Sequence, residues 1–138
     1  MIRFIERSSW ILFSILFLAG CGTINDFLQT SPSASLIGTW RPQNSSGAPA
    51  KLSFLRDGTY EFDVNGDGLV DVGGRYDILF NKQVKLQDED GEITPDCIEP
   101  AVYKFRIGAK GLKFYLLGDQ CWARAVLFRQ TWVKAYSY

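Results

Sequence analysis

Apolar and polar side chains alternate along most of the chain after residue 35, and this alternation limits what the chain can fold into. For example, Tyr103, Phe105 and Ile107 alternate with Lys104 and Arg106. Successive side chains of a β-strand point to opposite faces of a sheet, so a period of two predicts half-buried strands. No helix-length amphipathic segment interrupts the pattern. The expected strands are 36–40, 51–55, 59–64, 69–72, 75–79, 83–87, 102–107, 112–117 and 122–133.

Turns that contain glycine join most of these strands. Asp57-Gly58 supplies the positive φ angles of a tight hairpin, and Gly73-Gly74 predicts a bulge or sharp bend that curls the sheet. A long acidic loop is expected at 88–100. About eight strands with mostly short connections are enough to close a barrel, which also removes exposed sheet edges. The sequence therefore predicts an all-β fold, a small antiparallel up-and-down β-barrel.

The first 20 residues have the three parts of an export signal. Arg3 and Arg7 form a charged start, an apolar run follows, and Leu18-Ala19-Gly20-Cys21 ends it. The apolar run is too short to span a bilayer comfortably, because roughly 20 apolar residues are needed. The four residues that end it resemble the lipobox of bacterial lipoproteins. That resemblance implies that Cys21 is lipidated and becomes the first residue of the mature protein.

This interpretation divides the chain into three parts. They are a signal peptide (1–20), the lipidated cysteine with a flexible tether (21–35), and the barrel domain (36–138). The lipid on Cys21 would hold the protein at a membrane of the bacterial cell envelope. By resemblance to enteric lipoproteins, Gly22 lacks the aspartate of an inner-membrane retention signal. We therefore expect the outer membrane, with the domain facing the periplasm.

The two remaining cysteines, Cys97 and Cys121, form an even pair in a compartment that permits disulfides. A disulfide between them is expected. The alternative is a metal or redox site. The chain has no histidine, and neither cysteine has a nearby second thiol, so the pattern does not favour zinc.

Charge is balanced overall but uneven along the chain. The sequence has 15 basic and 15 acidic residues, and without Arg3, Arg7 and Glu6 it has 13 and 14. This balance gives no support for nucleic acid as a partner. Twelve acidic residues lie between 57 and 99, whereas seven basic residues follow residue 100. The pattern favours strands whose opposite charges meet across the sheet; the alternative is a surface field that steers a partner.

Three short motifs resemble the lipocalin-like proteins of the calycin group. They are Gly38-Thr39-Trp40 on the first strand, Asp57-Gly58-Thr59-Tyr60, and Arg124 on the last strand ahead of Trp132. In that group, a tryptophan of the first strand packs near an arginine of the last strand at the closed end of the barrel. The resemblance therefore implies that Arg124 lies over the ring of Trp40 and closes the barrel, a cation–π contact.

The segment 63–71 resembles the calcium loop of EF-hands. Its oxygen-bearing side chains Asp63, Asn65, Asp67 and Asp71 occupy loop positions one, three, five and nine. Position twelve is Gly74, where the loop needs a glutamate, and the flanking residues indicate strands. The alternative is a polar hairpin tip that uses Asn-Gly and Asp-Gly for positive φ. Calcium is the one cofactor for which the sequence offers candidate ligands.

Six aromatic residues are expected to face the barrel interior, where they would line a pocket for an apolar ligand or fill the barrel: Tyr60, Phe62, Tyr76, Tyr103, Phe105 and Phe114. The sequence lacks a catalytic triad, a nucleophile elbow and a phosphate-binding loop, so we expect no enzyme. The predicted function is binding of a small apolar ligand by a membrane-anchored, lipocalin-like barrel. The alternatives are a protein-interaction or inhibitor module with a filled barrel that acts through its loops, and a calcium-binding hairpin at 63–74.

Overall fold

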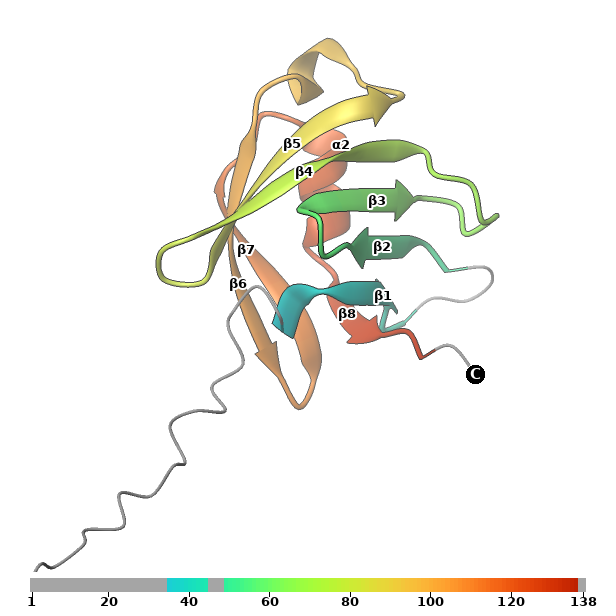
Figure 1. The fold of residues 1–138 in the computed structure, drawn as a ribbon, viewed down its shortest axis with the longest axis vertical. Coiled ribbons are helices and arrows are strands. Elements are labelled where there is room, and N and C mark those ends of the chain that lie inside the picture. Colours follow the sequence, from blue (N-terminus) through green and yellow to red (C-terminus); the bar gives the residue numbers. More distant parts are fainter. Residues whose placement is uncertain (1–34, 45–48, 137–138) are drawn as a thin grey trace, which may run out of the picture.

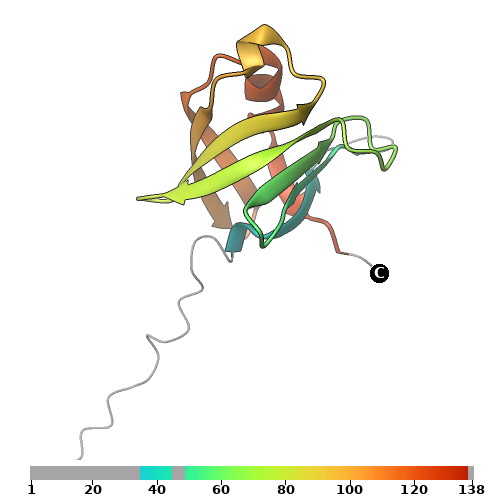
Figure 2. The same cartoon turned by 45° about the horizontal axis from the view of Figure 1, so that its top comes forward.

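The computed structural model describes residues 35–44 and 49–136, which form a closed antiparallel β-barrel with one short α-helix (Figures 1 and 2). Each strand pairs with the next along the chain, and the last pairs with the first. The predicted up-and-down barrel is therefore confirmed. The strands are β1 (Gly38–Pro42), β2 (Lys51–Phe54), β3 (Thr59–Asp63), β4 (Val72–Leu79), β5 (Gln83–Gly91), β6 (Ala101–Gly108), β7 (Gly111–Gly118) and β8 (Thr131–Lys134).

Two helical segments connect strands. The 3-10 helix η2 (Pro95–Cys97) lies between β5 and β6, and α2 (Trp122–Phe128) lies between β7 and β8. No helix in the described part of the chain is long and apolar enough to cross a membrane. The predicted signal peptide and the predicted lipidation site, Cys21, lie outside the described residues.

The barrel is filled by its own side chains. Every strand contributes at least one buried apolar residue, and Phe128 of α2 packs into the same cluster. Interlocking aromatic rings occupy the interior, as expected for a barrel of eight strands. The core cluster comprises Leu36, Trp40, Leu52, Phe54, Tyr60, Phe62, Tyr76, Val84, Leu86, Ala101, Tyr103, Phe105, Leu112, Phe114, Phe128 and Trp132.

The predicted turn at Gly58 and bulge at Gly73-Gly74 are confirmed. Gly58 has a φ of 86° in the hairpin between β2 and β3. The β4–β5 register shifts between Gly73 and Gly74. A Cβ on Gly74 would lie 2.0 Å from the backbone oxygen of Gln87, so the two strands approach more closely there than any side chain allows.

The prediction of a strand over 122–133 was wrong, because its first half is helix α2. Cys121, Arg124, Ala125 and Phe128 are buried and recur at helical spacing, so they form the inward stripe of the helix. This stripe contains a buried arginine, which hides the helical period in the sequence. The strand resumes at β8 and closes the barrel.

Two further boundaries differ from the prediction. No strand forms at 69–72: Leu69 and Val70 are 70% and 52% exposed, and β4 begins only at Val72. β5 continues to Gly91, so the expected acidic loop is strand over its first four residues and is a true connection only from residue 92. The alternation of β3 also ends early, because Asp63 is buried and Val64 is exposed.

Opposite charges meet across part of the barrel. Lys51 Nζ lies 3.7 Å from Asp63 Oδ2, and Asp77 of β4 is paired in register with Lys85 of β5. The β6–β7 hairpin differs, because Arg106 lies opposite Lys113 there. Cross-strand compensation therefore holds in the acidic half of the chain and fails in the basic half.

Candidate functional site

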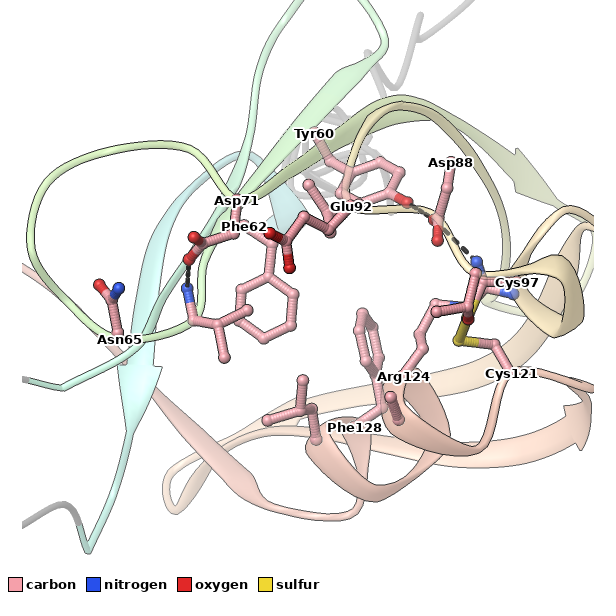
Figure 3. A pocket seen from close by; sticks show the side chains of 15 residues that line it. Tyr60, Phe62, Asn65, Asp71, Asp88, Glu92, Cys97, Cys121, Arg124 and Phe128 are labelled. Carbon is pink, nitrogen blue, oxygen red and sulfur yellow. Dashed lines mark hydrogen bonds and ion pairs between the residues drawn. A yellow bond between two sulfur atoms is a disulfide. The ribbon is translucent and has the colours of Figure 1, made fainter.

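A pocket of about 330 Å³ lies at one mouth of the barrel (Figure 3). We call it the mouth pocket. Its walls come from β3, the β3–β4 connection, the start of β4, the second half of β5, the segment that follows it through η2, and α2. Its volume lies at the lower end of the range for small-molecule sites.

The mouth pocket has an apolar part formed by two groups of side chains that face each other. Phe62, Val64 and Val72 belong to β3, the connection after it and β4, whereas Leu127 and Phe128 belong to α2. The rings of Phe62 and Phe128 meet edge to face, with centroids 6.4 Å apart. This contact closes the inner end of the pocket against the filled barrel.

A buried ion cluster forms the polar side of the mouth pocket, and Arg124 of α2 is its centre. Arg124 Nη1 lies 2.7 Å from Asp88 Oδ1. Nε and Nη2 donate to the two carboxylate oxygens of Asp119 at 2.9 and 2.8 Å. Nη2 also lies 3.1 Å from the carbonyl oxygen of Glu99. The side chains of Arg124 and Asp88 are each 5% exposed and that of Asp119 is fully buried, so the three charges depend on one another for solvation.

Two tyrosines complete the cluster. The hydroxyl of Tyr60 donates to Asp88, and the hydroxyl of Tyr103 donates to Asp119. Burial and the neighbouring carboxylate raise the pKa of both tyrosines. Burial alone would raise the pKa of Asp119, but hydrogen bonds from Arg124 and Tyr103 hold it below its ordinary value. Asp119 therefore stays ionised at neutral pH, with its charge balanced by Arg124.

Acidic groups outnumber basic groups around the mouth pocket. Asp71, Asp88 and Glu92 line it, against Arg124 alone among the cations. Figure 3 shows the Glu92 side chain directed into the pocket, where no described residue forms a hydrogen bond or ion pair with its carboxylate. Because Arg124 is also bound to Asp119, the net field inside the pocket is negative.

The disulfide between Cys97 and Cys121 ties η2 to the start of α2 and borders the mouth pocket. The expected pairing of these cysteines is therefore present. A carboxylate oxygen of Asp88 lies within 4.8 Å of both sulfurs. Among the described residues, these three side chains are the one group that could bring three metal ligands together. Both sulfurs are held in the disulfide, so they are not thiolate ligands.

The structure separates the six aromatic residues expected to line a ligand site. Tyr60 and Phe62 line the mouth pocket. The other four are buried in the core, where Tyr103 and Phe114, for example, meet edge to face. Filling of the barrel therefore describes Tyr76, Tyr103, Phe105 and Phe114. The pocket residues to which the sequence assigned no binding, disulfide or closure role are Val64, Val72, Asp88, Glu92, Thr94, Ala123, Leu127 and Phe128.

The predicted contact between Trp40 and Arg124 was wrong. The cation over the Trp40 ring is Lys134, whose Nζ lies 4.4 Å from the ring centroid. Antiparallel pairing of β1 with β8 sets Trp40 opposite Lys134, while Arg124 lies on α2 and is bound to carboxylates. Lys134 Nζ also donates to the carbonyl oxygen of Ile37 at 2.6 Å, so a lysine of the last strand makes the closure contact.

The four predicted calcium ligands lie at the end of β3 and in the β3–β4 connection, and each accepts a hydrogen bond from a backbone amide. Asp63 accepts from Gly66 and Gly68, and Asn65 accepts from Asp67. Asp67 and Asp71 accept from Leu69 and Val64, respectively. These bonds hold the hairpin tip in its turn conformation. Calcium binding here stays a prediction.

Comparison of the chain with protein-family models, curated proteins and solved structures finds no match. The geometry of the mouth pocket and the sequence therefore carry the functional argument.

Proposed function

We propose that this protein is a lipid-anchored protein of the bacterial cell envelope whose barrel binds a small, largely apolar ligand without transforming it. One observation carries the proposal: the mouth pocket joins an apolar lining to an ion cluster whose charged groups are already paired with one another. Such a site buries apolar surface and leaves few groups to bind a highly polar ligand. The packed core supports placing the ligand at the mouth instead of along the barrel axis.

The pocket also restricts the size and charge of the ligand. A water molecule, which has one non-hydrogen atom, occupies about 30 Å³ of liquid. At that volume for each non-hydrogen atom, the pocket of about 330 Å³ holds roughly ten such atoms. The excess of carboxylates disfavours an anionic head, since like charges repel most strongly in a partly desolvated site. A short neutral or cationic amphiphile is therefore the expected ligand class, whereas a fatty acid carboxylate is not.

A blocking substitution on α2 tests the proposal. Ala123 is exposed and lines the mouth pocket, while Val126 is exposed on the same helix and does not line it. Ala123→Trp should abolish the fluorescence change of the neutral probe 1-naphthylamine on binding, a probe close to the size that the pocket allows. Val126→Trp, the matched control, should bind the probe as the wild type does. Equal binding by both variants, or no binding by the wild type, would contradict the proposal.

Competition against the same probe tests the ligand class. Octylamine and octanoate have equal chain length and opposite charge, and octylamine should displace the probe at the lower concentration. Glu92→Gln should reduce this preference, because it removes a pocket carboxylate that has no ion-pair partner among the described residues. Glu61→Gln on the outer face of β3 is the control. Equal displacement by the two amphiphiles would leave apolar binding intact and refute the charge argument.

A protein partner is the second candidate function, and one observation favours it. Ile98 and Trp122 are 58% and 72% exposed, and the disulfide between their neighbours holds them close together. Exposed aromatic and aliphatic anchors of this kind are typical of interface centres. This candidate predicts that Trp122→Ala weakens partner capture and leaves probe binding unchanged.

The anchor and the location rest on the resemblance of residues 18–21 to a lipobox. We expect metabolic labelling with radioactive palmitate to mark the wild type and not Cys21→Ser. The variant should appear in the soluble periplasmic fraction, and the wild type in the outer-membrane fraction. Labelling of Cys21→Ser would contradict this part of the proposal.

A further inference from the structure

The outer face of the β6–β7 hairpin carries an uncompensated group of cations. Lys104 lies opposite Tyr115, and Arg106 lies opposite Lys113. All four side chains are exposed. Like charges directly opposite each other destabilise a sheet. The hairpin therefore carries a feature that fold stability does not explain.

Two further lysines extend this surface. Lys110 in the β6–β7 turn shares a surface hollow with Arg106, Lys113 and Tyr115, and Lys82 in the β4–β5 turn shares a neighbouring hollow with Lys104, Arg106 and Tyr115. Both hollows contain Arg106 and Tyr115, so the surface is continuous. We call this surface the basic pole and define it as Lys82, Lys104, Arg106, Lys110 and Lys113.

No acidic group neutralises the basic pole in the described part of the chain. The ion pairs there involve Lys51, Arg75 and Arg124, and none involves a member of the pole. The acidic residues gather instead at the β3–β4 connection and along the later part of β5. The barrel is thus polarised, and its positive end is open to solvent.

Exposed aromatic rings accompany the basic pole. Phe80, two residues before Lys82 in the β4–β5 turn, is 86% exposed, and Tyr115 is 48% exposed. Aromatic rings next to cations are typical of surfaces that lie at the boundary between lipid headgroups and acyl chains. A partner that accepts both charge and apolar side chains fits this combination.

The chain also enters the barrel beside this surface. Ser35, the first described residue, shares a hollow with Ile107, Gly108 and Ala109 at the β6–β7 turn. The 34 residues before Ser35 include the apolar run and Cys21. Whatever holds those residues at a bilayer therefore brings the basic pole close to the same bilayer. In Figure 1 the β6–β7 turn lies at the bottom of the barrel and η2, which borders the mouth pocket, at the top.

We propose that the basic pole, flanked by Phe80 and Tyr115, docks on an anionic lipid bilayer and orients the barrel with its mouth pocket away from the membrane. A lipid anchor alone leaves the orientation of the domain free, whereas a basic surface on the barrel attaches the domain itself to an anionic bilayer. Each lysine or arginine near an anionic surface strengthens binding about fivefold. Docking of the domain does not require Cys21, so it is testable apart from the anchor.

Residues 22–138 are a suitable sample, because the closed barrel, its core and its disulfide all lie within 35–136. The measurement is co-sedimentation with phosphatidylcholine vesicles, with and without phosphatidylglycerol. The test variant combines Lys104→Gln, Arg106→Gln and Lys113→Gln. The control variant replaces three exposed arginines outside the basic pole and has the same net charge as the test variant. Its substitutions are Arg41→Gln, Arg56→Gln and Arg129→Gln.

The domain should bind vesicles that contain phosphatidylglycerol, release them as salt rises, and ignore pure phosphatidylcholine. The test variant should bind about 100-fold more weakly, and the control variant within about fivefold of the wild type. The thermal midpoint of the test variant should equal or exceed that of the wild type, because like-charge repulsion is removed. Failure to bind anionic vesicles, or equal losses in both variants, would overturn the proposal. Equal or tighter binding to duplex DNA at the same salt would also overturn it, since the pole would then be a general polyanion site.

Discussion

Replacement of Arg124 by methionine should destabilise the protein strongly at neutral pH. The methionine has similar length but cannot solvate the buried carboxylates of Asp88 and Asp119, whose side chains are 5% and 0% exposed. Removing one partner of a buried ion cluster typically costs about 3–5 kcal/mol. Small domains are stable by about 5–15 kcal/mol. Arg124→Met should therefore remove a large share of the free energy of unfolding.

The loss of unfolding free energy in Arg124→Met should shrink in acid. The direction of this pH dependence follows from the pKa of the buried carboxyl group. In the wild type the pKa of Asp119 is held below its ordinary value, so its contribution is present above about pH 4 and is lost as pH falls through the lowered pKa. In Arg124→Met, burial without the arginine hydrogen bonds raises the pKa of Asp119. The variant is then least unstable at low pH and loses stability as pH rises above about 4. The two curves converge in acid and diverge toward neutrality.

Urea unfolding, followed by the fluorescence of the buried Trp40 and Trp132, measures this at about pH 7 and about pH 3.5. The control is Arg129→Met, an exposed arginine just after α2 with no ion pair to any described residue. It should change stability by less than about 0.5 kcal/mol. A cost for Arg124→Met below about 1 kcal/mol at pH 7, or an equal cost at both pH values, would refute the reasoning.

Three further outcomes follow from the described geometry. Replacing Cys97 and Cys121 together by alanine should lower the free energy of unfolding by about 3.5 kcal/mol, because the disulfide closes a loop of about 25 residues; a loss below about 1 kcal/mol in urea unfolding would contradict this. Gly74→Ala should cost more than about 2 kcal/mol and Gly73→Ala less than about 1 kcal/mol, since a Cβ would strike a β5 backbone oxygen in the first case and meet ordinary contacts in the second. If the hairpin tip binds calcium, added calcium should raise the thermal midpoint of the wild type and not of Asp67→Ala, whereas equal midpoints with and without calcium would end that proposal.

The barrel was predictable from the sequence because its signal is local and repeated. Alternation identifies the strands, and turn residues such as Gly58 indicate where they reverse. Helix α2 escaped prediction because its buried stripe includes Arg124, which looks like a surface residue until Asp88 and Asp119 are placed around it. A charged residue can be recognised as buried only when the partners that offset its desolvation cost are known, and those partners come from distant parts of the chain.

The mouth pocket was less predictable for the same reason. Phe62 was expected to face inward, but Glu92 and Leu127 reach the pocket from segments far apart in the chain. The closure contact depended on register, since the position at which β8 begins decides which cation lies over Trp40. The disulfide was predictable because counting left a single possible pair.

The occupancy of the mouth pocket is the central claim, and native mass spectrometry of residues 22–138 purified from a periplasm tests it most directly. The account predicts a retained mass of a small amphiphile on the wild type and on Val126→Trp, lost on denaturation and absent from Ala123→Trp. Retention of the same mass by Ala123→Trp would place the ligand elsewhere. A bare disulfide-bonded chain that also fails to take up added octylamine would contradict ligand binding itself.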